Sequence, residues 1–427
     1  MDRHLEITSA KVESALLDLP WSIPLAEWPD DIIAALPRGI SRHVVRFVNL
    51  GNKVIAIKEI SAEGANHEYE TLRDLNRLEA PCVEPIAVIT GRENTEGKPL
   101  NAALVTQHLP YSLPYRALFG QAPMRPETAE RLIDALSVLM VRLHLLGFFW
   151  GDVSLSNTLF RRDAGEFAAY LVDAETGELY SRMSDQKREY DVDIAFTNII
   201  GEFMDLQAGD ILEEDFDAIG AGNRFVERYN SLWAELTSEE QFSADERWRV
   251  DNRIRRLNEL GFDVGELSIS TDIFGTSIRI RPKVVDAGHY SRTLMRLTGM
   301  DVQEKQARRL MNDIESYRAM HDELNVPLSI VAHEWMTNIF EPAVRAIPKE
   351  LRGKLQPAQV FHELLDHRWF ASERAGHDVP MQEAVQSYIE EVLKHRPDES
   401  FMLTQTSTLP AIKTDFDDDW SGYMADD

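Results

Sequence analysis

The amino-acid sequence predicts an α+β protein with two lobes, followed by a mainly helical C-terminal domain. With 427 residues, the chain exceeds the size at which a single hydrophobic core stops growing. Short β-rich runs dominate residues 32–60, whereas apolar residues at helical spacing prevail along most of the chain after residue 125. Blocks of strands followed by blocks of helices are typical of α+β folds.

The first block contains five runs rich in β-forming residues, expected as strands at 32–41, 43–50, 53–60, 85–90 and 101–109. Gly51 and Asn52 form a turn signal between the second run and the third. A helix is expected between the third and fourth runs, because Leu72 and Leu75 have helical spacing and Pro81 follows.

The second block begins with a long amphipathic helix over residues 125–148, with Pro126 near its start. Two strand-like runs follow at 157–160 and 169–173, and then a helix at 191–206. These elements complete the second of the two predicted lobes.

A hairpin is expected over residues 266–285 and indicates a further domain. After it, four helices are expected at 302–320, 328–340, 357–373 and 381–395. The expected division of the chain is an N-terminal extension, two lobes, the C-terminal domain and an acidic, disordered tail, at 1–30, 31–109, 110–240, 241–397 and 398–427.

Composition limits the classes of function. A formal net charge of −27 disfavours non-specific attraction of the whole molecule to nucleic acid or to an anionic membrane. Cys82 is the only cysteine, which excludes an intrachain disulfide and a cysteine-based metal cluster. The sequence lacks signal-peptide features and any apolar run of membrane-spanning length. We therefore expect a cytoplasmic protein without integral membrane association.

Four elements occur in the order that phosphoryl transfer requires. Lys58 ends a strand, where an ammonium group can meet phosphates, and Glu68 follows on the next helix. Glu68 lies four residues before Leu72 and therefore shares its inward face, which favours Glu68 over Glu70 as the partner of Lys58.

The other two elements supply acidic and amide groups after the long helix. Asp152 and Asn157 lie five residues apart in the segment GDVSLSN, so that a carboxylate can serve as a base while a neutral amide binds metal. Asp173 ends the second strand-like run, and its carboxylate suits a hard cation such as Mg²⁺.

This order resembles that of protein kinases. It is most similar to the atypical bacterial branch, which contains lipopolysaccharide core (Kdo) kinases, aminoglycoside-phosphotransferase-like enzymes and RIO kinases. Ser154 fits the G-D-x-S that these relatives often carry. The resemblance spans residues 32–206 and implies a two-lobed protein-kinase-like fold that uses ATP and Mg²⁺.

The resemblance also implies roles for individual residues. Asp152 corresponds to the catalytic base, Lys58 and Glu68 correspond to the phosphate-positioning pair, and Asp191 corresponds to an aspartate that supports the catalytic loop. The implied metal ligands are Asn157 and Asp173. Residues 359–379 resemble an uncharacterised bacterial family in which such a region is fused to a helical domain of unknown function.

Three features depart from the kinase pattern. No G-x-G-x-x-G precedes Lys58, and the substitute is a segment whose backbone and side chains can meet phosphate, with Arg38, Gly39 and Ser41. Trp150 replaces a common histidine, and Ala174-Glu175 replaces Phe-Gly. Two hypotheses therefore stay open. One is an active kinase for a hydroxyl acceptor such as a sugar, glycan or small molecule, and the other is a nucleotide-binding scaffold that presents the C-terminal domain to a protein or RNA partner.

Other polar residues have simpler interpretations. His144 is expected in the core, and Glu175 is left open between a metal ligand and a loop charge. His362 and His367 lie five residues apart, off a common helical face, which argues against a metal site.

Aromatic and basic residues of the C-terminal half are also ambiguous. Three aromatic residues are expected in the core, namely Trp335, Trp369 and Phe370. Residues 247–309 hold 13 Lys or Arg against 8 Asp or Glu. Alternate positions of one strand carry Arg279, Arg281 and Lys283, a patch for phosphate, RNA or an acidic partner, although pairing with the chain's own acidic surface is favoured.

Overall fold

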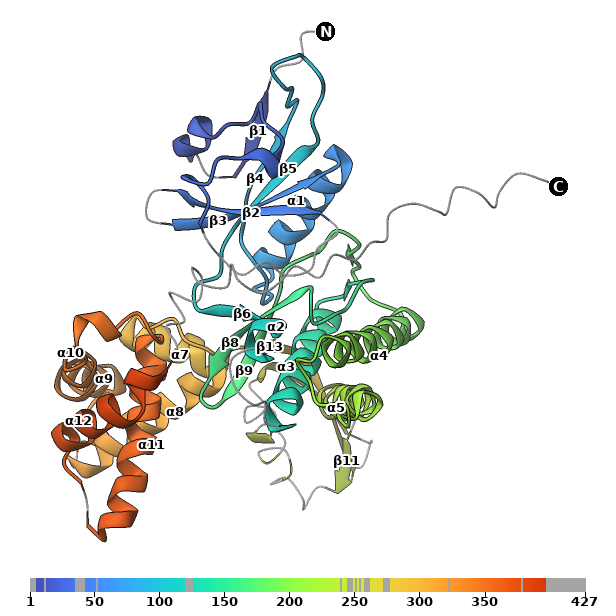
Figure 1. Ribbon diagram of the computed structural model, residues 1–427. Coiled ribbons are helices and arrows are strands. Elements are labelled where there is room, and N and C mark those ends of the chain that lie inside the picture. The colour runs from blue at the N-terminus through green and yellow to red at the C-terminus, as the bar shows by residue number, and fades with distance from the viewer. Residues whose placement is uncertain are drawn as a thin grey trace.

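The computed structural model describes residues 5–10, 13–34, 43–50, 53–119, 126–238, 240–243, 249, 252, 255–256, 262–271, 277–321, 323, 325–377 and 379–396. A sheet-containing lobe carries the N-terminus, a lobe of helices and short strands lies below it, and a separate group of helices lies beside the second lobe (Figure 1). The predicted α+β fold, with two lobes and a helical C-terminal part, is confirmed.

The first lobe contains a five-stranded antiparallel sheet in the order β1-β4-β5-β3-β2. Its strands are β1 Glu6–Ser9, β2 Val44–Leu50, β3 Lys53–Ile60, β4 Pro85–Thr90 and β5 Ala102–Gln107. Helix α1 (Ala62–Arg77) begins at Ser61, whose hydroxyl accepts from the Gly64 N–H, and packs against β4 and β5. Because side chains alternate along β3, Ile55 and Ile57 are buried on one face, and Lys58 lies on the other.

The start of the chain is part of this lobe. Strand β1, which the sequence pattern did not predict, pairs with β4 along Glu6–Ser9. Trp21 and Trp28 are buried with their rings edge to face at 5.2 Å, in the same core cluster as Ile55 and Ile57. The strand predicted over residues 32–41 contributes only an isolated bridge from Ile33 to Val48 within the described residues.

The second lobe is built around helix α3 (Pro126–Leu145), which lies against α5 (Ala218–Thr237) and β9. Its remaining elements are β6 Ser112–Pro114, α2 Tyr115–Phe119, β7 Phe148–Phe149, β8 Thr158–Asp163, β9 Glu166–Leu171, β10 Glu178–Leu179 and α4 Asp185–Ala208. Strands β6, β8 and β9 form an antiparallel sheet, and β10 pairs with β7. Gly147 has φ +85°, and a Cβ atom there would lie 2.1 Å from the Tyr180 carbonyl oxygen, so a glycine is required where α3 turns into β7.

The hairpin expected over residues 266–285 is present. Strands β12 (Phe262–Thr271) and β13 (Ser277–Ala287) pair antiparallel, and β11 (Glu240–Ser243) extends the sheet on the other edge of β13. The connecting residues 272–276 lie outside the described part of the chain, as do the side chains of this sheet.

The C-terminal part has its own hydrophobic core, which extends from Leu294 to Leu393. Its helices are α7 His289–Thr298, α8 Glu304–Met320, α9 Leu328–Trp335, the π-helical η4 Met336–Phe340, α10 Glu341–Arg345, α11 Pro357–Ala375, α12 Met381–Glu391 and the short η5 Lys349–Leu351 and η6 Leu393–His395. Trp335 is fully buried, as predicted.

The prediction that Trp369 and Phe370 are core residues is wrong. Their exposed fractions are 60% and 56%, and they contact each other edge to face at 4.8 Å. The buried side chains of α11 all lie in its first half, between Ala358 and Leu364. The aromatic pair lies beyond this buried stretch and faces solvent.

The C-terminal helices join the second lobe at the β8–β9 hairpin. The Asp163 carboxylate at the end of β8 accepts from the backbone N–H groups of Gln306 at 2.7 Å and Lys305 at 3.2 Å, in the first turn of α8. Burial raises the pKa of Asp163 to about 6, and these two N–H groups oppose the rise. A side chain of the second lobe thus caps a helix of the C-terminal part.

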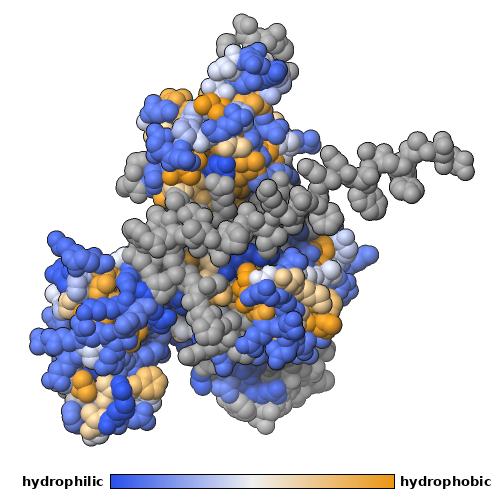
Figure 2. All heavy atoms as spheres, in the orientation of Figure 1, coloured by the Kyte–Doolittle hydropathy of each residue, from blue (hydrophilic) through white to orange (hydrophobic). Residues whose placement is uncertain are grey.

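Hydrophilic residues dominate the molecular face shown in Figure 2, with apolar residues in small separate groups. Within the described residues, none of the helices has the length and apolar character needed to cross a membrane. The predicted limits of the five chain segments stay a prediction. The acidic tail at 398–427 lies outside the described residues.

Candidate active site

Lys58 is surrounded by carboxylates. Its Nζ atom lies 3.0 Å from Oε2 of Glu68 and 2.8 Å from Oδ2 of Asp173. A third carboxylate, that of Glu175, approaches the same nitrogen to 3.1 Å. Burial alone would lower the pKa of Lys58, but the Glu68 and Asp173 charges hold it above its ordinary value, so the side chain is a cation.

Glu68 reaches Lys58 from the inward face of α1, as its spacing from Leu72 predicts. Only 1% of its surface is exposed, whereas Glu70 is exposed. Its second oxygen, Oε1, accepts from the Ala174 N–H at 3.3 Å. Burial raises the pKa of Glu68 to about 7, the Asp173 charge adds to the rise, and Lys58 opposes it. The Lys58–Glu68 pair therefore links the first lobe to the segment that follows β9.

Asp152 and Asn157 face each other across the loop between β7 and β8. The Asn157 side-chain amide donates to the Asp152 carbonyl oxygen at 3.0 Å and to its carboxylate Oδ2 at 3.1 Å. The Ser154 hydroxyl accepts from the Asn157 N–H at 3.1 Å. These bonds fix the two side chains that the sequence singled out in one orientation.

Helix α4 holds this loop from below through three polar residues of one face. Asp191 accepts from the backbone N–H groups of Trp150 at 2.7 Å and Gly151 at 2.8 Å, and the Asn198 amide donates to a loop carbonyl oxygen at 2.9 Å. Glu202 accepts from the N–H groups of Leu155 and Ser156 at 2.8 Å each. Burial raises the pKa of Glu202, and the Ser156 hydroxyl opposes the rise.

The sequence pattern indicates Asp191 but gives no direct indication of Asn198 and Glu202. Their spacing could have identified them. Asn198 and Glu202 follow Asp191 by seven and eleven residues, which is about two and three helical turns, so all three side chains lie on the same face of the helix.

His144 is buried between Asp191, 3.2 Å away, and the Tyr229 hydroxyl, 2.6 Å away. Burial lowers its pKa, and Asp191 opposes the fall. This agrees with the expected core histidine.

The structure also gives a reason for the tryptophan at position 150, where the kinase pattern often has histidine. It is buried, and its indole Nε1–H donates to the Asp173 carbonyl oxygen at 3.0 Å. The Thr176 hydroxyl donates to the Trp150 carbonyl oxygen at 2.8 Å. The indole therefore ties the loop that bears Asp152 to the strand end that bears Asp173.

Two adjoining cavities open onto these residues. One, of about 400 Å³, lies between the lobes, with Lys58 and Glu68 at its wall and apolar side chains such as Leu104 and Val172 around it. The other, of about 580 Å³, is lined by Asp152. Asn157 and Asp173 line both. Arg38, Gly39 and Ser41, the expected phosphate-binding segment, lie outside the described residues.

The donor set suits a hard cation. Oxygen atoms of Glu68, Asp173 and Glu175 all lie within 4.8 Å of one another, and Asn157 adds an amide at the same cavity walls. Carboxylate and amide oxygens are the ligands that Mg²⁺ prefers, so the residues present fit that ion. Glu175 also accepts from His43, whose Nε2 lies 2.9 Å away, so its position is set by Lys58 and His43 together.

The two histidines of α11, His362 and His367, contact different polar partners. His367 Nε2 lies 2.7 Å from the Ser387 hydroxyl, and His362 lies 3.5 Å from the Asp366 carboxylate. Among the described residues, the three carboxylates around Lys58 are the one group arranged to hold a metal ion.

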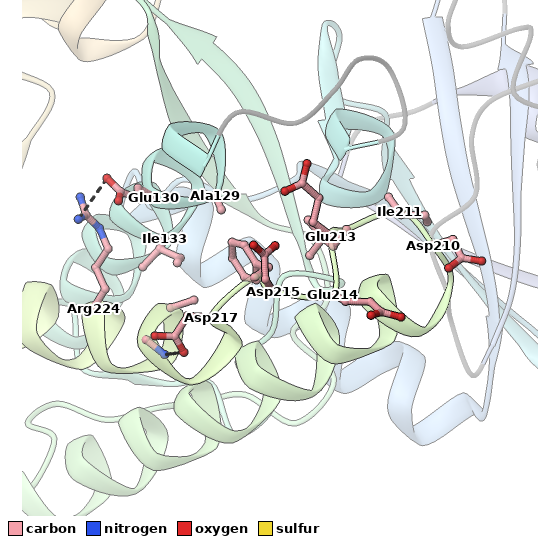
Figure 3. Close-up of a pocket in the computed structure, with 14 residues that line it drawn as sticks. Ala129, Glu130, Ile133, Asp210, Ile211, Glu213, Glu214, Asp215, Asp217 and Arg224 are labelled. Carbon is pink, nitrogen blue, oxygen red and sulfur yellow. Dashed lines mark hydrogen bonds and ion pairs between the residues drawn. The ribbon is translucent and has the colours of Figure 1, made fainter.

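A third cavity, of about 770 Å³, lies away from these residues, beside the loop between α4 and α5 (Figure 3). Its walls carry Glu130 from α3 and the acidic side chains of the loop, with Arg224 of α5 paired to Glu130 at 3.3 Å. Its acidic residues take no part in the contacts around Lys58 or Asp152.

Two parts of the chain match protein-family models. Residues 51–195 match the model of the lipopolysaccharide kinase (Kdo/WaaP) family. The matched lipopolysaccharide kinase segment contains Lys58, Glu68, Asp152, Asn157 and Asp173. Residues 231–393 match a domain of unknown function, DUF4032. These matches confirm the resemblance to lipopolysaccharide kinases and the fusion to an uncharacterised helical domain.

Comparison with curated proteins gives no match. Among solved structures, WaaP in complex with acyl carrier protein matches at a TM-score of 0.35 and 13% identity, over 60% of this chain and 99% of that chain.

Proposed function

We propose that the chain is a phosphotransferase that moves the γ-phosphoryl group of ATP to a hydroxyl group of a sugar, glycan or other small molecule. The observation that carries this proposal is the convergence of Lys58, Glu68 and Asp173 in one ion-paired group beside the Asp152–Asn157 loop. The match to the lipopolysaccharide kinase family supports an acceptor of the sugar class.

In this proposal Lys58, held by Glu68, positions the nucleotide phosphates, and Asp152 accepts the proton of the acceptor hydroxyl. The hydroxyl oxygen forms a bond to the γ-phosphorus, the bond from that phosphorus to the β–γ bridging oxygen breaks, and ADP leaves with the bond electrons. Asn157 and Asp173 are the proposed ligands of Mg²⁺, which when bound supplies neutralisation of phosphate charge. Arg38, Gly39 and Ser41 stay proposed phosphate contacts.

Three of the segments predicted from the sequence have a proposed role in this function. Residues 31–109 and 110–240 form the two lobes around the cleft, and residues 241–397 supply acceptor recognition or a partner surface. In the strand register, Arg279, Arg281 and Lys283 occupy alternate positions of β13. These three basic positions are the proposed contact for a protein or RNA partner.

The role of Asp152 separates an enzyme from a nucleotide-binding scaffold. The variant Asp152→Asn should lower ATP turnover about 10²–10⁴-fold, because it removes the proton acceptor, while Mg-ATP affinity stays within about threefold of wild type. The measurements are ADP release and isothermal titration calorimetry with Mg-ATP. Asp193→Asn, which changes an exposed residue of α4, is the matched control and should leave both ATP turnover and Mg-ATP affinity unchanged.

Two results would contradict the proposal. Tight Mg-ATP binding without turnover in the wild type, with every acceptor supplied, would favour the scaffold. Absence of Mg-ATP binding would exclude both functions for this cleft.

A further inference from the structure

The segment between α1 and β4 is bonded to the second lobe. The Leu171 N–H, at the end of β9, donates to the Pro81 carbonyl oxygen at 2.9 Å. The Leu171 carbonyl oxygen accepts from the Val83 N–H at 3.0 Å. We call residues 79–83 together with Leu171 the α1–β9 junction.

The α1–β9 junction adjoins the proposed chemistry on both sides. Helix α1, which carries Glu68, ends two residues before the junction begins, and Asp173 lies two residues beyond β9. Val83 and Val172 line the cavity between the lobes, as Lys58 does. Because a helix moves as a rigid rod, displacement of the junction changes how the two acidic side chains meet Lys58.

Helix α7 of the C-terminal part contacts this junction by an ion pair. The Arg292 Nη1 atom lies 3.0 Å from Oε2 of Glu79, and the pair joins segments 213 residues apart in the sequence. The side chains of Arg292 and Glu79 are 35% and 66% exposed. Substitution of either residue therefore leaves the hydrophobic cores intact.

Helix α8, which packs against β8 (Figure 1), connects α7 to the second lobe. The Glu304 carboxylate, in the first turn of α8, accepts from the backbone N–H groups of Tyr290 at 2.8 Å and Ser291 at 3.0 Å, in the first turn of α7. The next two N–H groups of α8 bond to Asp163 at the end of β8. Polar contacts of α7 and α8 thus reach from Asp163 in the second lobe to Glu79 in the first.

We infer that the C-terminal helices act as a positioning element for the proposed active site, with Arg292 and Glu79 as positioning residues. Arg292 holds the α1–β9 junction through Glu79, and the junction sets the positions of the carboxylates that meet Lys58. In protein kinases, the lysine–glutamate pair and the metal-binding aspartate must be in place together. Contiguous contacts and rigid helices can carry such coupling between distant sites. The inference rests on the proposed function and concerns regulation of that same site.

Reversal of the two charges tests the pair in the full chain. Arg292→Glu and Glu79→Arg should each raise the Mg²⁺ concentration for half-maximal binding of a non-hydrolysable ATP analogue about threefold, an effect typical of an exposed ion pair. The double variant exchanges the charges and should return the value to within about 1.5-fold of wild type. Calorimetric titration at a series of Mg²⁺ concentrations gives both the affinity and the fraction of protein that binds. Loss of folded protein would lower that fraction without changing the Mg²⁺ requirement.

Hydrogen exchange gives a second readout that needs no nucleotide. Peptides that cover residues 79–83 and 171–177 should exchange about threefold faster in each single variant and at the wild-type rate in the double variant. Arg345→Glu is the matched control, because Arg345 forms an exposed ion pair with Glu341 of α10 and the charge change is the same. It should alter neither the Mg²⁺ requirement nor the exchange of these peptides.

Three results would overturn the inference. One is a wild-type Mg²⁺ requirement and wild-type exchange in the single variants. Another is faster exchange with an unchanged Mg²⁺ requirement, since the ion pair would then be structural only. The third is a defect in the double variant equal to the sum of the single defects, because the two residues would then act independently.

Failure of the inference can be told from failure of the proposed function. If the analogue binds the wild type and both single variants behave as Arg345→Glu does, the proposed function stands and the positioning role is wrong. If the analogue does not bind the wild type at any Mg²⁺ concentration, the proposed function fails and the positioning role fails with it.

Discussion

Lys58 and Glu68 form a buried pair in which the acid bears the larger energetic cost. Glu68 is 1% exposed, and its ionised form must be held against both desolvation and the nearby Asp173 charge. In the unfolded chain this carboxyl has its ordinary pKa of about 4.3. The pKa of about 7 in the folded chain means that the folded state binds a proton more tightly than the unfolded state does.

The pH dependence of stability follows from this difference. The contribution of Glu68 to the free energy of unfolding should be fully present below about pH 4 and lost as the pH rises through 7. Between pH 8 and pH 5, the free energy of unfolding of the wild type should therefore rise by about 2 kcal/mol relative to Glu68→Gln. Urea unfolding at a series of pH values measures it.

Glu70→Gln is the control, since Glu70 is exposed on the same helix. Its stability should follow that of the wild type at every pH. If the curves of wild type and Glu68→Gln run parallel between pH 8 and pH 5, the raised pKa of Glu68 is refuted.

At the scale of elements, hydrogen bonds from polar groups of two helices fix the catalytic loop and the contact between the second lobe and the C-terminal helices. Helix α4 fixes the catalytic loop with Asp191, Asn198 and Glu202, which share one face. Helix α8 is fixed by its first turn, whose N–H groups bond to Asp163 of the second lobe. In both cases a carboxylate satisfies backbone donors that would otherwise be buried without a partner.

Loss of the Asp163 cap should loosen the start of α8. In Asp163→Ala, the amide hydrogens of Lys305 and Gln306 should exchange about fivefold faster, since a helix cap is worth about 1 kcal/mol. Hydrogen exchange followed by mass spectrometry of α8 peptides gives the measurement.

Asp217→Ala, which removes the N-cap of α5, serves as the control. It should speed exchange at the start of α5 and leave α8 unchanged. Unaltered exchange of α8 in Asp163→Ala would show that the start of this helix does not depend on the Asp163 carboxylate.

At the scale of the whole molecule, the hydrophobic cores divide the chain. The clusters that contain Leu104 and Ile55 serve the two lobes, whereas every buried apolar residue from Leu294 to Leu393 belongs to a separate cluster. A segment with its own core can fold by itself.

The fragment 289–396 should therefore fold alone. We expect a helical circular-dichroism spectrum and a single cooperative unfolding transition, with a stability of roughly 5 kcal/mol, which is ordinary for a domain of this size. Gradual unfolding without a transition would show that the C-terminal helices depend on the second lobe.

Much of the fold and the site was predictable, because it depends on local patterns. Helix α1 ends at Arg77, before Pro81 as the sequence predicts, and the β12–β13 hairpin coincides with its two β-rich runs. The pairing of Lys58 with Glu68 followed from strand position and helical spacing, and it is present at 3.0 Å. These features depend only on residues that are close in the sequence, within a few helical turns or along one strand.

The tertiary structure alone decided the rest. Strand β1 is defined by its pairing with β4, some eighty residues away, and Glu175 by its contacts with Lys58 and His43. Trp369 and Phe370 follow a helical pattern, yet they lie beyond the buried stretch of α11 and are exposed. By itself, the sequence determined the α+β class and the order of the site residues, because spacing and alternation are local. Which charges meet and which aromatic residues are covered depends on distant segments, and only the folded chain brings those together.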